Sequence, residues 1–241
     1  MSWFYALFGQ IIFFLKPVIH LLYPDLCIHC KRELTAKSPY LCYTCLMDLE
    51  LIKWQRKQIY NQVFQAIQST SVVQICALYR FRDSAPIQTL LHELKYRHNS
   101  RLGAYFGTVL GLQFQEENAT IFAQALIPVP IHPRKRFDRG YNQSELIANG
   151  VSRIICVPVK TNLIKKAFNT KTQTKLSKKG RAQNIRGSFR ISDDIVNYQS
   201  VAIVDDVITT GATINAICEA LLEKNANLQI TIFSLALAQS V

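Results

Sequence analysis

The chain has 241 residues, of which 49% are hydrophobic, and it carries a net charge of +12 at pH 7. That length and apolar content suit one α/β domain with a small appendage. Its seven cysteines are an odd number without a regular framework, which argues against a secreted disulfide scaffold and favours the reducing cytoplasm.

The first segment of the chain is strongly apolar. Residues 3–23 are rich in large aromatic and aliphatic side chains, but polar residues and a proline interrupt them. The longest unbroken apolar stretch is therefore well short of the ~20 residues that cross a bilayer. We predict an amphipathic helix over residues 1–23 that docks on the fold or makes a peripheral contact, through residues 3–23, with the inner face of the cell membrane. A membrane anchor is the alternative left open.

Two C-x-x-C pairs lie in the next segment, residues 24–50, and eleven residues separate them. Each pair can turn both thiolates toward one tetrahedral ion, so we predict a structural Zn²⁺ module with four protein ligands. A redox motif or unlinked thiols are the alternatives, but a redox pair belongs on a βαβ unit that this segment does not suggest. The expected ligands are Cys27, Cys30, Cys42 and Cys45.

The middle of the chain alternates helical and extended patterns. A polar connector over residues 51–70 precedes a β-branched, alternating run that predicts a strand over residues 72–81. Apolar spacing of three and four residues predicts helices over residues 85–96 and 102–112. The isolated cysteines, Cys76, Cys156 and Cys218, lie in apolar segments and are expected to be buried thiols.

A short apolar strand, residues 125–131, leads into a strongly basic turn and then a helix over residues 143–155 with Asn142 as its cap. Positive side chains on a turn at a helix N-terminus would hold a diphosphate. A plain exposed basic loop is the alternative. The candidate anion-binding residues are His132, Arg134, Lys135, Arg136 and Arg139.

The positive charge is concentrated in one part of the chain. Residues 131–190 hold fifteen Lys or Arg and only two acids, which implies an anionic partner: diphosphate, nucleic acid or both. Within it, residues 165–190 are polar, cationic and without a sustained period, as expected of a lid over a charged ligand. Its candidate residues include Lys171, Lys175 and Arg181.

The most informative stretch is residues 201–213. An apolar strand runs into two adjacent carboxylates, a Thr-Thr-Gly turn follows, and an apolar-periodic helix begins at Ala212. The exposed N–H groups of a helix start favour a bound phosphate, and neighbouring carboxylates suit the hydroxyls of a sugar. The stretch therefore predicts a ribose 5-phosphate site. An acidic strand end with a Thr helix cap is the alternative.

This stretch resembles the phosphoribosyl-diphosphate (PRPP) loop of class I phosphoribosyltransferases. The resemblance implies an α/β fold over residues 71–241, with a parallel sheet flanked by helices, and PRPP bound with Mg²⁺. Asp205 and Asp206 would hold the ribose. The 5-phosphate would lie on Val207, Ile208, Thr209, Thr210, Gly211, Ala212 and Thr213. Members that act on 6-oxopurines carry an Asp where this chain has Thr209, so that substrate class is not expected.

Taken together, the motifs resemble the ComF family of competence-associated proteins. They are the paired C-x-x-C motifs, LKY at residues 94–96, VPIHPRKRFDRGYNQSE at residues 129–145 and VDDVITTGAT. A further spaced motif comprises Thr170, Gln173, Leu176, Arg181, Asn184, Gly187 and Phe189. Just before it the family usually carries arginines, whereas this chain has Lys165 and Lys166, which keep the charge but lose the bidentate fork.

Membership would imply a role in natural transformation, with single-stranded DNA and other DNA-uptake or recombination proteins as partners. Two hypotheses stay open at this point. The chain is either a non-catalytic PRPP-binding protein that handles incoming DNA, or an active phosphoribosyltransferase of nucleotide metabolism or salvage, with an unidentified acceptor and no DNA role. No residue stands out as a general base.

Overall fold

The computed structural model describes residues 23–34, 38–52, 67, 69, 71–82, 86–96, 99–117, 123–166 and 187–238. The chain divides into two compact units, Met1–Leu49 and Glu50–Val241. The predicted N-terminal helix, most of the predicted connector and most of the predicted lid, with Lys171, Lys175 and Arg181, lie outside the described residues.

The first unit is small and is built from turns. An isolated antiparallel bridge joins Leu26 to Glu33, and Lys31 within it takes a left-handed φ of 61°. The short helix α2 (Tyr43–Met47) follows, with Cys42 at its N-cap. Tight backbone bonds, such as Cys27 N–H to the Arg32 carbonyl at 2.8 Å, close the first turn.

The second unit is built on a parallel sheet with the strand order β1-β6-β5-β2. The strands are β1 (Val72–Phe81), β2 (Leu126–Pro128), β5 (Ser200–Ile208) and β6 (Gln229–Ala238). All three strand pairings are parallel. The central strands are almost wholly buried, which explains their nearly continuous apolar sequences.

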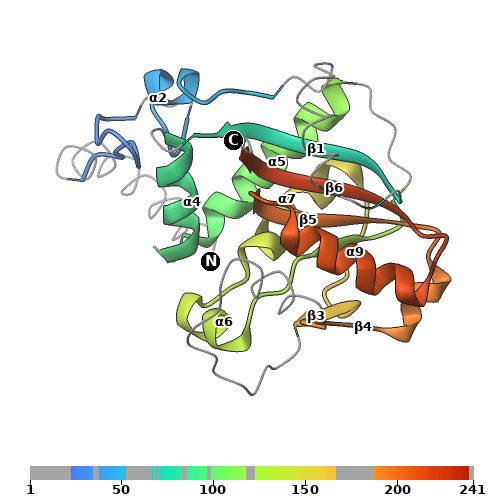
Figure 1. Cartoon of the computed structure of the whole chain (residues 1–241). Helices are drawn as coiled ribbons and strands as arrows, with labels where there is room; N and C mark the ends of the chain where they lie inside the picture. The colour runs from blue at the N-terminus through green and yellow to red at the C-terminus, as the bar shows by residue number, and fades with distance from the viewer. Residues whose placement is uncertain are drawn as a thin grey trace, which may run out of the picture. The chain divides into compact units, whose positions relative to one another are not determined.

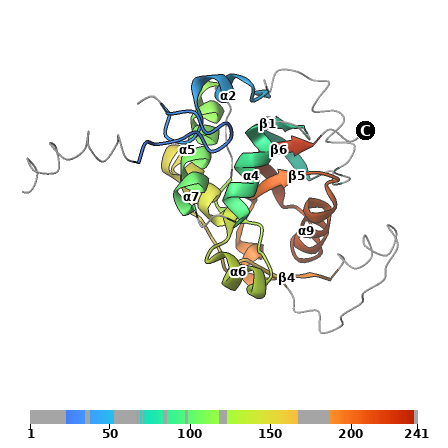
Figure 2. The ribbon, with the colours of Figure 1, turned by 90° about the vertical axis from the view of Figure 1, so that its left-hand side faces the viewer.

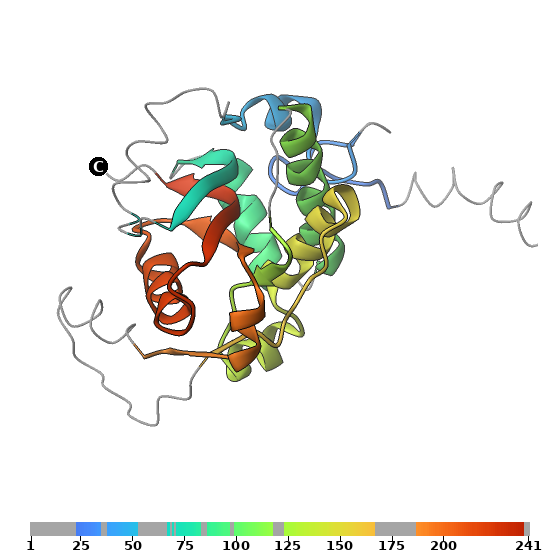
Figure 3. The same ribbon diagram turned by 90° about the vertical axis from the view of Figure 1, so that its right-hand side faces the viewer.

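Helices cover both faces of this sheet. They are α4 (Pro86–Tyr96), α5 (Ser100–Glu116), α7 (Gln143–Ile155) and α9 (Ala212–Lys224). Figures 2 and 3 show α5 and α7 on one face and α9 on the other. The predicted fold class, an α/β domain with a parallel sheet flanked by helices, is confirmed.

Two helices on the same face pack unusually closely. A Cβ placed on Gly107 of α5 would lie 2.2 Å from the Ile147 carbonyl oxygen, and one on Gly150 of α7 would lie 2.3 Å from the Ala104 oxygen. Real Cβ atoms do not approach a carbonyl that closely. The glycines of these helices therefore allow backbone-to-backbone packing.

The smaller elements lie beside the sheet. They are α6 (Pro133–Arg139), the antiparallel pair β3 (Ile164–Lys166) and β4 (Phe189–Ile191), and the 3₁₀ helix η1 (Asp193–Asn197). Figure 1 shows β3 and β4 side by side, apart from the main sheet. Within the described part of the chain, no helix is long and apolar enough to cross a membrane.

Three local expectations need correction. The basic turn is in fact helix α6, because Pro133 suits the first helical position, His132 caps it and Gly140 ends it at a φ of 76°. The strand after Ser200 continues through both carboxylates to Ile208, since β6 pairs with it along that length. Cys156 is exposed, because it lies at the C-cap of α7 and not on its apolar face; Cys76 and Cys218 are buried as predicted.

Candidate functional site

The carboxyl ends of the parallel strands meet at one edge of the sheet. In Figure 1 this edge faces α4 and α6, and Figure 2 looks onto it. Ligands of open α/β sheets bind outside the carboxyl ends of the strands. The candidate site therefore lies near the end of β5, where the two adjacent carboxylates are found.

Asp205 contacts the first turn of α7. Its Oδ1 accepts a hydrogen bond from Ser144 Oγ at 3.1 Å and another from the Asp206 backbone N–H at 2.9 Å. Asp205 lies deep among protein atoms but keeps partial contact with solvent. Burial, and after it the negative charge of Asp206, raise the pKa of Asp205 to about 8. The negative charge of Asp206 thus disfavours ionisation of Asp205.

Asp206 is paired with a lysine from another helix. Its side chain is buried, and its Oδ2 lies 2.9 Å from Lys95 Nζ at the end of α4. The Val207 backbone N–H donates to its Oδ1 at 2.9 Å. The Lys95 contact is a charge pair more than an aligned hydrogen bond, since no described residue donates a well-oriented bond to Oδ2.

The turn after β5 leads directly into helix α9. Thr209 and Thr210 are exposed, and Gly211 takes a left-handed φ of 73° at the N-cap, where it offers no side-chain cap. The Ala212 N–H donates to Thr210 Oγ1 at 3.4 Å, a long and weak bond. Thr210 thus supplies a weak side-chain contact at the N-terminus of α9.

The predicted diphosphate residues on α6 have varied partners. His132 Nδ1 accepts from the Arg134 N–H at 3.2 Å, and so caps the helix. Arg136 pairs with Glu145 of α7 at 3.2 Å. The Arg139 guanidinium lies 5.3 Å from the centre of the Tyr96 ring. Each of these side chains therefore has a structural contact that binding an anion would weaken.

A further lysine lies within electrostatic reach of Asp205. Lys166 of β3 is half-buried, and its Nζ lies 5.5 Å from the centre of the Phe189 ring. Burial, and after it the charge of Lys135, lower the pKa of Lys166, while Asp205 acts in the opposite direction. Lys166 is therefore near enough to both Lys135 and Asp205 to interact with their charges.

Lys95, Ser144 and Lys166 were not among the predicted site residues. Their signals were present: Lys95 lies in the LKY motif, Ser144 in the NQSE run and Lys166 in the basic pair at the start of the predicted lid. None of these signals shows which side chain will face Asp205 or Asp206. That depends on helix and strand packing between distant parts of the chain.

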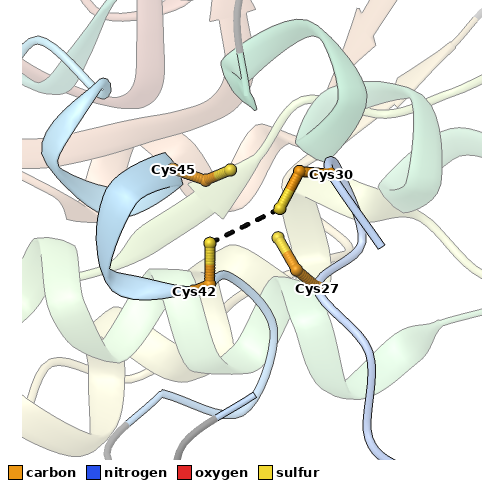
Figure 4. A group of neighbouring side chains, drawn as sticks. All are labelled: Cys27, Cys30, Cys42 and Cys45. Carbon is orange, nitrogen blue, oxygen red and sulfur yellow. Dashed lines mark hydrogen bonds between the residues drawn. The ribbon is translucent and has the colours of Figure 1, made fainter. Parts of the chain in front are cut away.

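The four predicted zinc ligands come together in the first unit. Their Sγ atoms all lie within 4.8 Å of one another, and those of Cys30 and Cys42 are 3.5 Å apart (Figure 4). Sulfurs around a zinc ion at ~2.3 Å would be about 3.8 Å apart, so the group fits a tetrahedral site. His29 is exposed and does not belong to it. The cluster is consistent with a structural zinc.

The electrostatics of the cluster also suit a metal. The Arg32 side chain donates to Cys30 Sγ at 3.3 Å, and this bond is the largest cause that lowers the pKa of Cys30 to about 6. Burial raises the pKa of Cys45. Packed thiolates repel one another, and a bound cation would relieve that repulsion and deprotonate all four thiols.

Known proteins similar to this chain were found by sequence comparison. Competence protein F of Haemophilus influenzae is 30% identical over 226 residues, which cover 88% of this chain and 96% of that protein. The chain belongs to the ComF family. No family model matches it.

Two other relatives fit this assignment. The DNA utilization protein YhgH of Escherichia coli O157:H7 is 32% identical over 144 residues, which cover 58% of this chain and 63% of that protein. The competence protein ComFC of Bacillus subtilis is 23% identical over 225 residues, 90% of this chain and 87% of that protein. The alignments with Competence protein F and with ComFC thus cover most of this chain and most of each relative.

Proposed function

We propose that this ComF-family chain binds PRPP at the end of β5 and acts in natural transformation, in the handling of incoming single-stranded DNA. One observation carries the proposal for the ligand. Asp205 and Asp206 lie near the carboxyl end of β5, which runs to Ile208, and the turn at residues 209–211 leads from that strand into the N-terminus of α9. One ligand could therefore bind both the two carboxylates and the backbone N–H groups at the start of α9.

The two halves of that ligand follow from the chemistry of the donors. A phosphate suits the N-terminus of α9, where Gly211 allows close approach and Thr210 offers a hydroxyl. Neighbouring carboxylates accept hydrogen bonds from a pair of sugar hydroxyls. A ribose 5-phosphate has both the phosphate and the hydroxyls. Its 5-phosphate would bind to residues 207–213.

A diphosphate on the same sugar would face positive side chains. Lys135 and Lys166 lie within electrostatic reach of each other and Lys166 of Asp205, and Arg134 lies on the same short helix as Lys135. Mg²⁺ fits this donor set because it prefers carboxylate and phosphate oxygens. When bound with PRPP, it would neutralise charge on the diphosphate. The protein's own cations hold the other oxygens.

The role in transformation rests on the relatives. Their names refer to competence and DNA utilization. The chemistry of this chain supports it: the basic helix α6 carries Phe137, whose side chain is 88% exposed, and Tyr96 near Arg139 is 59% exposed. Exposed aromatics among cations suit bases and phosphates of a single strand. DNA-uptake and recombination proteins are the expected protein partners.

Catalysis is the second candidate function. If PRPP is cleaved, its diphosphate leaves as an acceptor attacks the ribose, and Lys135 and Lys166 would stabilise the departing charge. Release of diphosphate in the presence of candidate acceptors measures this directly. Tight PRPP binding without release, for every acceptor tried, would leave the non-catalytic role.

The ligand proposal is tested by a double substitution, Asp205→Asn with Asp206→Asn. Calorimetry with PRPP and Mg²⁺ should show binding to the wild-type chain and a loss of at least roughly tenfold in the variant. The matched control is Asp193→Asn with Asp194→Asn, an adjacent and exposed acidic pair on η1. Equal PRPP affinity of all three chains would overturn the proposal.

The same variants test the DNA role. Anisotropy with a labelled single strand should show affinity that falls steeply with salt, because bound cations release counterions from the phosphates. Loss of PRPP binding with DNA binding kept would separate the two sites. Affinity that is weak and does not change with salt would exclude this role for the chain.

A further inference from the structure

Lys95 is held over the carboxylate pair by the end of α4. It lies in the last turn of that helix, whose buried face contains Leu90, Leu91 and Leu94. Its Nζ lies 2.9 Å from Asp206 Oδ2, and the two side chains are 25% and 9% exposed. This is therefore a largely desolvated ion pair inside the candidate site and not a surface contact.

In the free protein, Lys95 compensates the negative charge of the buried Asp206 side chain. Two adjacent carboxylates are enclosed at one strand end, and an uncompensated buried charge is strongly destabilising. Lys95 supplies the compensating charge, since no described residue donates a well-oriented hydrogen bond to Asp206 Oδ2. With Lys95 there, one oxygen of the ribose-binding pair is already occupied.

A sugar that uses Asp206 must compete with this lysine. If a ribose hydroxyl takes Oδ2, Lys95 loses its partner and needs another anion within reach of its flexible stem. Ribose 5-phosphate brings none near C1, because its phosphate lies at the other end of the sugar. PRPP brings a diphosphate on C1 itself, next to the hydroxyls that face the carboxylates.

We propose that Lys95 is the specificity-determining residue of this site: it pairs with Asp206 in the free protein and transfers to the diphosphate when PRPP binds. The proposal rests on the PRPP site proposed above and deepens it. Binding of PRPP exchanges one ion pair for another, whereas binding of ribose 5-phosphate breaks one without replacement. The lysine thereby favours the activated sugar over its monophosphate.

The test measures both ligands by calorimetry, with Mg²⁺, on the wild-type chain and on Lys95→Met. We expect PRPP affinity to fall by about tenfold or more, while ribose 5-phosphate affinity stays the same or rises. The conservative variant Lys95→Arg should keep most of the preference for PRPP. Lys160→Met, which removes an exposed lysine, is the matched control and should change neither affinity.

A folding defect is addressed by a charge-balanced variant. Lys95→Met combined with Asp206→Asn removes both members of the ion pair, so neither charge is left buried without its partner. The preference for PRPP over ribose 5-phosphate should be smaller in this double variant than in Asp206→Asn alone. Equal losses for both ligands in Lys95→Met would show a merely structural role and overturn the proposal. An unchanged PRPP affinity would overturn it too.

The outcomes also separate this proposal from the one it rests on. A wild-type chain that binds no PRPP contradicts the proposed function as a whole. A wild-type chain that binds PRPP, with Lys95→Met binding both ligands as before, contradicts only the assignment of Lys95.

Discussion

The Tyr141 hydroxyl donates a hydrogen bond to the Leu94 carbonyl at 2.8 Å. It joins the segment between α6 and α7 to the end of α4, one residue before Lys95. Burial raises the pKa of Tyr141, so the phenol stays protonated and remains a donor at neutral pH. Tyr141 thus holds the end of α4 in place, and the ion pair of Lys95 depends on the position of that helix end.

Tyr141→Phe should loosen that helix end. Loss of a part-buried hydrogen bond costs about 1 kcal/mol of unfolding free energy, and we expect PRPP affinity to fall a few-fold because Lys95 is less well positioned. Urea unfolding and calorimetry measure the two effects. Tyr43→Phe, an exposed tyrosine of the first unit, is the control; if both variants behave alike, the Leu94 contact does not position Lys95.

Stability should depend on pH through Asp205. Its pKa is raised to about 8 in the folded chain, against ~3.9 in an unfolded one. Between these values the folded chain holds a proton that the unfolded chain has lost, so rising pH favours unfolding. The stability of the wild type relative to Asp205→Asn should therefore fall from pH 4 to pH 8. Urea unfolding at several pH values checks this, and parallel curves would contradict it.

Zinc content should follow the cysteine cluster. The wild-type chain is expected to bind one zinc ion, and Cys42→Ser should lose most of it because one of four ligands is gone. Since metal and folding are coupled, the first unit should also melt at a lower temperature. Elemental analysis and thermal melts measure both. Cys156→Ser, an exposed cysteine of the second unit, should keep its zinc; a parallel loss there would argue against the assignment.

The contact of α5 with α7 should tolerate no side chain at Gly150. A Cβ there would lie 2.3 Å from the Ala104 carbonyl oxygen, so Gly150→Ala must push the helices apart. We expect a loss of about 1–3 kcal/mol in unfolding free energy, measured with urea. Asn149→Ala, on the exposed side of the same helix, should be near neutral. Equal stability of the two variants would mean that the helices can separate freely.

Much of the fold could be predicted because its signals are local. The alternating run of β1 matches the observed strand, Val72–Phe81, and Asn142 caps α7 as its sequence indicates, since its Oδ1 accepts from the Ser144 N–H at 3.1 Å. β6 is not among the predicted elements, although it pairs on both sides. A short apolar run without alternation does not distinguish a central strand from a buried helix.

The candidate site was predictable only in part, because some of its residues are neighbours in the sequence and others come together only in the folded chain. The residues from Asp205 to Gly211 are contiguous in the sequence. Their order, two carboxylates followed by a Thr-Thr-Gly turn, is enough to predict a sugar-phosphate site. Lys95 approaches them from a helix more than a hundred residues earlier in the chain, and only the packing of α4 brings it within 2.9 Å of Asp206. Single-sequence patterns contain no information on such a pairing.

The strand order β1-β6-β5-β2 has a consequence for folding. Val72 near the start of the second unit pairs with Ile230 near the end of the described chain, so β1 has no partner in the main sheet until β6 has been synthesised. Contacts between segments so distant in sequence form slowly. On the ribosome, β1 therefore stays unpaired in the main sheet until β6 has been synthesised, and only then can the main sheet be completed.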